Sequence, residues 1–288
     1  MIDDIIQRLY ADHTRDTLYH YTNLQGLQGI VDSGVLRASD VRYMNDSTEL
    51  RHTLELMQQH ISRRLQAGTA HPALLNALQE WLSHRVVGGP MLFAASFRAN
   101  GNLLGQWRGY SSLGKGVSLG FSPDWLRERA DAQDFQIARC IYAPNHQQML
   151  VEEIVDAVED DAQRDLEAHG RLDADGIFER LESRLLRIAA VLKHPAFEEE
   201  QEWRLVSPVM DDCQNVPVCF REGVSMLIPW YPFHLGSRDS GPMQLEHVFL
   251  GPTPNTDLSM NSLTLYLRKR GVEPHRGVEY CRIPYRQR

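Results

Sequence analysis

The chain has 288 residues, of which 42% are hydrophobic and 24% charged, and its formal net charge is −8. This composition is that of an ordinary soluble globular protein, and the acidic balance argues against a general nucleic-acid binder, which usually presents a basic face. No stretch approaches the roughly 20 apolar residues that span a bilayer, and residues 1–6 lack the basic start of a signal peptide. The four cysteines are scattered without a CxxC pair, so we expect reduced thiols in a cytoplasmic protein.

The first third of the chain predicts one strand followed by helices. The pattern indicates a strand at 17–22 and helices at 24–33, 47–67 and about 72–84. Gly34 follows the first of these helices and is expected to close it. His20 lies at the end of the predicted strand, where a fixed backbone can aim an imidazole into a cleft. A lone His in such a position is more often structural than catalytic.

The middle third predicts a central strand and two long helices. The pattern indicates strands at 91–97, 117–121 and 135–142, and helices at 102–110, 123–132, 146–169 and 173–193. The strand at 91–97 is almost continuously apolar, as expected for a strand buried on both faces. Gly170 separates the two long helices, and each carries an apolar stripe. We therefore expect a helical hairpin inserted at about 146–194.

The last third is rich in strands. The pattern indicates strands at 202–209, 216–220, 226–228, 245–250 and 280–285, with a helix at about 258–270. Strands and helices alternate irregularly along the chain, without βα repetition or sandwich spacing, which predicts a single α+β domain over 1–288 with helical additions. The glycines at 114 and 116 lack P-loop spacing, and no GxGxxG motif occurs. A dinucleotide would therefore be held without a Rossmann fingerprint.

Glu202 and Arg204 mark the most informative strand. They are two residues apart, so their side chains lie on one face of the strand, while Trp203 lies on the other. Charged side chains are seldom buried unless they are paired. This face therefore holds either an internal Glu202–Arg204 ion pair or part of a polar cleft. We expect Trp203, like Phe93 in the central strand, to be largely buried.

A set of short motifs runs along nearly the whole chain. They are LYHYT at 18–22, VRYMND at 41–46 with Glu49, ASF at 95–97, LGQWRGY at 104–110, KHPAF at 193–197, EQEWR at 200–204, LGP at 250–252 and IPYR at 283–286. As a set they resemble the bacterial domain-of-unknown-function family number 2971. The layout is more distantly similar to the ADP-ribosyltransferase superfamily. In that superfamily a His on the first strand, an aromatic or Ser in the middle and a Glu on a late strand surround the nicotinamide ribose of NAD.

The resemblance to ADP-ribosyltransferases implies a split mixed or antiparallel sheet that binds NAD. It gives Glu202 the catalytic role, because a carboxylate stabilises the positive charge that develops on the ribose when the nicotinamide bond breaks. It gives His20 and the Thr22 hydroxyl the task of holding ribose hydroxyls or the diphosphate. The further candidates are Tyr21 or Tyr110 to stack on nicotinamide, Arg108 or Arg42 to neutralise the diphosphate, and Ser96 to position a ribose or amide oxygen.

The sequence departs from the superfamily pattern in its middle strand, where Ser96 is followed by Phe and Arg instead of Thr and Ser. Glu200 stands two residues before Glu202, as in superfamily members that modify Arg or nucleotides. That match is too short to assign the acceptor, which is a protein, a nucleic acid or a small molecule.

Three functions stay open from the sequence. The first is an NAD-dependent ADP-ribosyltransferase, as in bacterial toxins and phage-defence effectors, with a neutralising partner protein. The second is a catalytically silent ligand-sensing or interaction domain on the same fold. The third is a metal-dependent nucleic-acid enzyme with Asp46, Glu49 and Glu202 as ligands. The first expects His20 and Glu202 in one cleft, the second expects a closed or filled cleft, and the third expects converging carboxylates.

Overall fold

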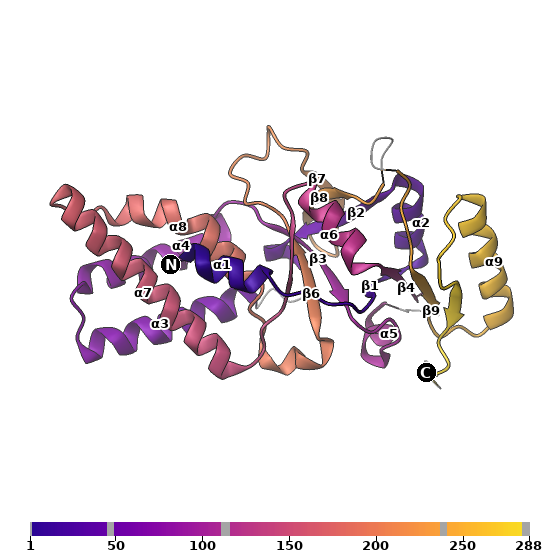
Figure 1. Ribbon diagram of the computed structural model, residues 1–288, viewed down its shortest axis with the longest axis horizontal. Coiled ribbons are helices and arrows are strands. Elements are labelled where there is room, and N and C mark those ends of the chain that lie inside the picture. Colours follow the sequence, from indigo (N-terminus) through magenta and orange to yellow (C-terminus); the bar gives the residue numbers. More distant parts are fainter. Residues whose placement is uncertain (1, 45–48, 111–115, 237–240, 284–288) are drawn as a thin grey trace.

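The computed structural model describes residues 2–44, 49–110, 116–236 and 241–283. An open, mostly antiparallel sheet is flanked by helices, and a group of helices projects from one side of it (Figure 1). This is the α+β architecture that the sequence predicts. Within these ranges no helix is long and apolar enough to cross a membrane.

The sheet contains ten strands among the described residues, in the order β10-β9-β4-β1-β3-β2-β8-β7, with β6 pairing to β3 and β5 to β6. The strands are β1 (Leu18–Asn23), β2 (Val35–Asp40), β3 (Phe93–Arg98), β4 (Gly116–Phe121), β5 (Gln136–Arg139), β6 (Glu202–Val206), β7 (Cys219–Glu222), β8 (Leu227–His234), β9 (His247–Leu250) and β10 (Val278–Tyr280). Neighbouring strands are antiparallel except β10 and β9, which are parallel.

The central strand β3 has a divided edge. Along one side it pairs with β6 over its residues 94–98. Along the other side, β2 pairs only with Phe93 and Ala94, and β1 only with Arg98. Residues 95–97 therefore face a gap between β1 and β2, where no ladder continues. Because β1 and β6 both pair with β3, the strand of His20 lies close to the strand of Glu202, as predicted.

The helices are α1 (Ile2–Tyr10), α2 (Leu24–Ser33), α3 (Glu49–Ala67), α4 (Pro72–Gly88), α5 (Leu104–Tyr110), α6 (Pro123–Asp131), α7 (Pro144–His169), α8 (Ala174–Ala189) and α9 (Thr256–Lys269), with 3₁₀ turns η1 (Val41–Tyr43) and η3 (Pro195–Glu200). The boundaries of α2 follow from capping. The Asn23 side chain accepts the Gly26 amide, and Gly34 adopts the left-handed conformation at φ 67° that glycine tolerates best.

The buried apolar residues form two large cores. One lies on the sheet and includes Phe93, Phe97, Phe121 and Trp203. Phe93 is fully buried and Trp203 is 6% exposed, which confirms the prediction for both. The other core joins α1, α3, α4, α7 and α8. The predicted hairpin of α7 and α8 is present, and it packs with three further helices into the projecting group (Figure 1).

Four elements differ from the sequence prediction. The last predicted strand, at 280–285, is replaced by β10 at Val278–Tyr280, where the chain pairs with β9, and residues 281–283 lie outside it. Helix α1 was not predicted, although its buried face of Ile2, Ile5 and Tyr10 packs it onto the other helices. Strand β2 was also not predicted. Strand β8 extends well past its predicted end at residue 228 and includes two prolines, Pro229 and Pro232. Proline is normally a signal against a strand, so tertiary pairing with β2 and β7 overrides the local pattern.

Candidate functional site

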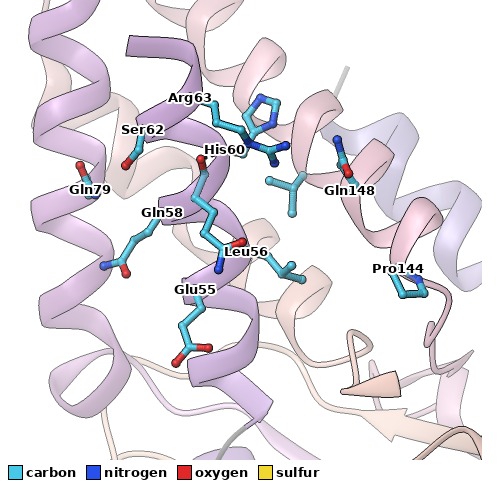
Figure 2. Close-up of a pocket in the computed structure, with 11 residues that line it drawn as sticks. Glu55, Leu56, Gln58, His60, Ser62, Arg63, Gln79, Pro144 and Gln148 are labelled. Carbon is cyan, nitrogen blue, oxygen red and sulfur yellow. Dashed lines mark hydrogen bonds between the residues drawn. The ribbon is translucent and has the colours of Figure 1, made fainter. Parts of the chain in front are cut away.

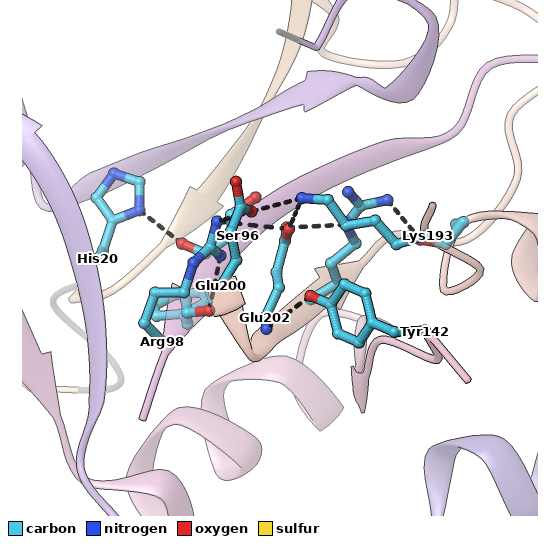
Figure 3. Close-up of polar contacts among 10 residues, drawn as sticks. His20, Ser96, Arg98, Tyr142, Lys193, Glu200 and Glu202 are labelled. Atoms are coloured by element: carbon cyan, nitrogen blue, oxygen red, sulfur yellow. Dashed lines mark hydrogen bonds and ion pairs between the residues drawn. The ribbon is translucent and has the colours of Figure 1, made fainter. Parts of the chain in front are cut away.

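His20 fills the gap between β1 and β2. It lies within β1 and not at its end, and its partly buried ring packs against Phe97 at 5.8 Å. Its Nδ1 lies 3.0 Å from the backbone oxygen of Ser96 (Figure 3). Since a carbonyl only accepts, Nδ1 carries the proton and Nε2 presents a lone pair. The imidazole thus donates a hydrogen bond to the Ser96 carbonyl, which faces the gap in the sheet. Its Nε2 can accept a hydrogen bond from another molecule.

Glu202 is enclosed by cations at the start of β6. Its carboxylate is buried, and Lys193 Nζ lies 2.5 Å and Arg98 Nη2 3.5 Å from Oε2. Arg204 Nε donates to Oε1 at 2.9 Å. The Glu202–Arg204 ion pair that the sequence left open is therefore present, as part of a larger network. Breaking one side of such a buried network is strongly destabilising.

Glu200 is the more accessible carboxylate of the same network. Its Oε2 lies 2.6 Å from Arg98 Nη2 and 2.6 Å from Lys193 Nζ, and a quarter of its side chain is exposed. We call the group of Arg98, Lys193, Glu200, Glu202 and Arg204 the charge cluster (Figure 3). It holds three cations and two carboxylates, so its formal charge is +1.

Two local features hold the carboxylates in place. Gln201 adopts the left-handed backbone conformation at φ 41°, which turns the chain between Glu200 and Glu202. A non-glycine residue there is under strain of the kind that concentrates at functional sites. The buried Tyr142 hydroxyl accepts the backbone amide of Glu202 at 2.9 Å. A pocket of about 380 Å³, lined in part by Tyr142, Cys140 and Gln201, lies against this side of the cluster.

His20 and Glu202 do not lie on the same face of the sheet. Tyr19 pairs with Arg98, and Arg98 pairs with Glu202, so these three side chains share one face. The alternation of a strand then places His20 on the opposite face with Phe97 and Trp203. The sequence expected one cleft between the two side chains. Instead, Arg98 and Glu200 lie between them (Figure 3), because β3 separates their strands.

The pKa shifts follow from this packing. Burial alone would raise the pKa of Glu202, but Arg204, Arg98 and Lys193 outweigh it and hold that pKa far below its ordinary value of 4.5. Burial lowers the pKa of His20, Arg98 lowers it further, and the Ser96 hydrogen bond opposes this in part. His20 is therefore neutral and Glu202 ionised at neutral pH. Arg98 stays charged, yet its buried Nε has no hydrogen-bond partner among the described residues.

The other residues that the sequence proposed for NAD binding do not gather around His20 and the charge cluster. Tyr21 is buried against Trp107, with ring centroids 4.9 Å apart, and its hydroxyl donates to the Asn100 carbonyl, which is a core position. Thr22 is half-buried beside α2, and Arg108 is exposed on α5. Arg42 pairs with Asp40 at 2.6 Å. The Tyr110 side chain lies outside the described residues.

Ser96 takes part through its backbone carbonyl, while its half-buried side chain belongs to the face of Glu202. Sequence reasoning missed Arg98, Lys193 and Tyr142 as partners of that carboxylate. The available signal was weak. Arg98 follows the ASF motif at the end of β3, and Lys193 begins the KHPAF motif in the segment between α8 and η3.

The metal hypothesis gains no support from the described part of the chain. There, no group of three or more His, Cys, Asp or Glu side chains could hold a metal ion. Asp46 and the side chain of Glu49, its two proposed ligands besides Glu202, lie outside the described residues.

A pocket of about 740 Å³ lies on the helical group (Figure 2). Its lining includes the neutral amides of Gln58, Gln59, Gln79 and Gln148. The charges there are carried by Glu55 and Arg63, and within the described part of the chain neither side chain joins an ion-pair network like that at Glu202. We therefore place the candidate site on the sheet.

Comparison with known proteins supports one resemblance. Residues 106–205 match the family model described as Protein of unknown function (DUF2971). The matched segment runs from α5 through most of β6 and contains Lys193, Glu200, Glu202 and Arg204 of the charge cluster. No curated protein matches the chain, and no solved structure does.

Proposed function

We propose that the chain binds NAD where β1, β3 and β6 meet and transfers its ADP-ribose to an acceptor. One observation carries this proposal. The late strand β6, to which the ADP-ribosyltransferase resemblance assigns its Glu, pairs along one edge of the middle strand β3. The first strand β1, which carries His20, pairs with β3 at its divided edge, and both pairings include Arg98. His20 already occupies that edge with one ring nitrogen free to accept a hydrogen bond.

In this proposal His20 holds a ribose hydroxyl, and NAD extends from His20 past Arg98 to Glu200. Arg98 and Glu200 lie between His20 and Glu202, which do not share one cleft (Figure 3). Its Nδ1–H is fixed by the Ser96 carbonyl, so the Nε2 lone pair has one orientation and needs no rearrangement on binding. Burial and the Arg98 charge lower the pKa of the ring, which keeps Nε2 unprotonated at neutral pH. A fixed acceptor of this kind orients a sugar for reaction.

The charge cluster supplies the electrostatics. Its formal charge of +1 and the unmet Arg98 Nε favour an anionic group such as a diphosphate. The carboxylate within reach of a ribose is that of Glu200, because a quarter of its side chain is exposed while Glu202 is enclosed. We assign Glu200 to the developing positive charge and Glu202 to positioning Arg98 and Lys193.

A second candidate is a catalytically silent domain that binds a nucleotide-like ligand. The observation that favours it is the complete enclosure of Glu202, whose two carboxylate oxygens are both paired with cations. A carboxylate neutralised in this way offers little to a developing oxocarbenium ion. The same pocket chemistry would then serve recognition alone.

The test is to measure NAD binding by calorimetry and nicotinamide release by chromatography on the purified chain, with and without cell lysate as a source of acceptor. Binding with release supports the transferase. Binding without release under any condition supports the silent domain. No binding would overturn the transferase, and it would overturn the silent domain as a receptor for NAD. His84→Ala is the matched control for His20→Ala, since His84 also bonds a backbone carbonyl through Nδ1 but is exposed on α4.

A further inference from the structure

An arginine and a tryptophan meet on the outer face of β2 and β8. The guanidinium carbon of Arg37 lies 5.0 Å from the centre of the Trp230 ring. Arg37 is exposed, and Trp230 is half-buried but belongs to none of the apolar cores of the described residues. The indole N–H of Trp230 is buried without a hydrogen-bond partner among those residues. An unpaired buried donor is costly, so packing alone does not explain this tryptophan.

The charges on this face are not balanced. Arg221 of β7 also lies on it, diagonally beside Trp230 in the register of β7 and β8. The carboxylates of β2 and β7, Asp40 and Glu222, lie on the opposite face because side chains alternate along a strand. Within the described part of the chain, neither Arg37 nor Arg221 makes an ion pair or a side-chain hydrogen bond.

This face continues that of the charge cluster. Trp230 pairs with Ser39, and Ser39 pairs with Ala94 of β3. Paired residues share a face, so Trp230 lies on the same side of the sheet as the charge cluster. If the register of β2 on β3 continued by two residues, Arg37 would stand opposite Ser96. Arg37 therefore lies across the gap beside β3 from the half of that strand that ends in the charge cluster.

We propose that Arg37 and Trp230 form a subsite for a nucleoside phosphate. The base stacks on the open side of the Arg37 guanidinium, which the Trp230 ring supports, and the unpaired arginine charges attract the phosphate. A ligand with a phosphate but no ring would not use the indole, and an apolar ligand would leave both arginines unpaired. Stacking combined with positive charge is how proteins hold single nucleotides.

The subsite also assigns a direction to the ligand of the proposed function, on which this assignment rests. The adenine of NAD lies on Arg37, and its neighbouring ribose lies at His20. The diphosphate then passes Arg98, and the nicotinamide ribose reaches Glu200. All four contacts follow one path from β2 across the gap to the charge cluster.

The test is calorimetric titration of the full chain with adenosine monophosphate. The wild type should bind it, and Arg37→Ala and Trp230→Leu should each bind about tenfold more weakly. Arg37→Lys should also bind more weakly, because it keeps the charge but loses the planar group. Arg282→Ala is the matched control, since Arg282 lies over Tyr280 at 5.5 Å beyond β10, at the opposite end of the sheet. It should bind like the wild type.

Two results would overturn the subsite. One is a wild type that does not bind adenosine monophosphate, and the other is unchanged binding in Arg37→Ala. Because Arg37 is exposed, Arg37→Ala should fold like the wild type and decides the question even if Trp230→Leu does not fold. Ribose 5-phosphate, which has no base, should not displace adenosine monophosphate. Equal displacement would show that no base is stacked and would also overturn the subsite.

Competition identifies the source of the nucleotide and separates this inference from the proposed function. Displacement of adenosine monophosphate by NAD, and weaker NAD binding in Arg37→Ala, support both. Displacement by a single-stranded oligonucleotide but not by NAD would support the subsite and overturn the proposed function. Nicotinamide release by a wild type that does not bind adenosine monophosphate would support the proposed function and overturn the subsite.

Discussion

The carboxylate of Glu202 is buried among charged partners, and its replacement is therefore expected to change the stability of the protein. Lys193, Arg98 and Arg204 surround it, and the Tyr142 hydroxyl holds its backbone amide. Glu200 shares two of these cations but keeps a quarter of its side chain in solvent. The two carboxylates therefore differ in burial while they share partners, which makes them a natural matched pair.

Glu202→Gln should lower the free energy of unfolding by about 3–5 kcal/mol, because it leaves buried cations without their counter-charge. Glu200→Gln should cost about 1 kcal/mol or less, since solvent can replace much of its interaction. Urea unfolding of both variants measures the difference. If Glu200→Gln is the more stable protein but loses nicotinamide release while it still binds NAD, the assigned roles hold. Equal stability losses would contradict the enclosure of Glu202.

The same enclosure predicts a dependence of stability on pH. The pKa of Glu202 is far below 4.5 in the folded chain, so the unfolded chain takes up its proton first as pH falls. The contribution of Glu202 to stability is complete above that ordinary value and is lost progressively below it. Thermal melts from neutral to acid pH should show a steeper loss for the wild type than for Glu202→Gln. Parallel curves would contradict this.

The roles of the two ring nitrogens of His20 can be tested separately with two substitutions. His20→Asn keeps a side-chain N–H that can reach the Ser96 carbonyl but removes the Nε2 acceptor, whereas His20→Ala removes both. We expect both variants to bind NAD more weakly, and His20→Ala alone to lose about 1 kcal/mol of stability for the unpaired carbonyl. Calorimetry and urea unfolding measure the two effects. Full NAD affinity in His20→Asn would remove Nε2 from the proposed site.

Among the elements, β3 and β6 position both the sheet core and the charge cluster. Each directs aromatic side chains to the sheet core and polar side chains to the opposite face. This is why Trp203, although it lies between Glu202 and Arg204 along the chain, packs into the sheet core on the opposite face from their ion pair. Packing of the aromatic face fixes the strands, and the strands fix the charge cluster.

Trp203→Ala should therefore cost about 3–5 kcal/mol of stability, as expected for a large buried side chain. Leu258→Ala, at an exposed position of α9, should change stability by less than about 0.5 kcal/mol. Thermal and urea unfolding compare them. A Trp203→Ala protein as stable as the wild type would mean that β6 is not anchored through this face.

For the molecule as a whole, the sheet and the helical group have separate cores, and the candidate site lies on the sheet. A ligand that binds only the folded chain stabilises it by about 2.7 kcal/mol at a concentration 100 times its dissociation constant. NAD should therefore raise the melting temperature of the wild type and of His84→Ala, but much less that of His20→Ala. An unchanged wild-type melting temperature at saturating NAD would contradict the proposed site.

The nearness of the strands of His20 and Glu202 was expected from a shared cleft that the structure does not form. The sequence by itself determined the α+β class, the helical hairpin and the buried aromatic strands. These depend on local periodicity and on residue types that favour strands or helices, which act over a few residues. It could not predict β2 or the length of β8, because pairing between distant strands overrode weak or proline-interrupted patterns.

Only the tertiary structure decided which charges meet. Lys193 and Arg98 come from a segment after α8 and from β3, and no local pattern links them to Glu202. The register of β1 on β3 and of β3 on β6 placed His20 and Glu202 on opposite faces. A shift of one residue reverses the face of every side chain on a strand, so the composition of the site depends on pairing that the linear sequence does not encode locally.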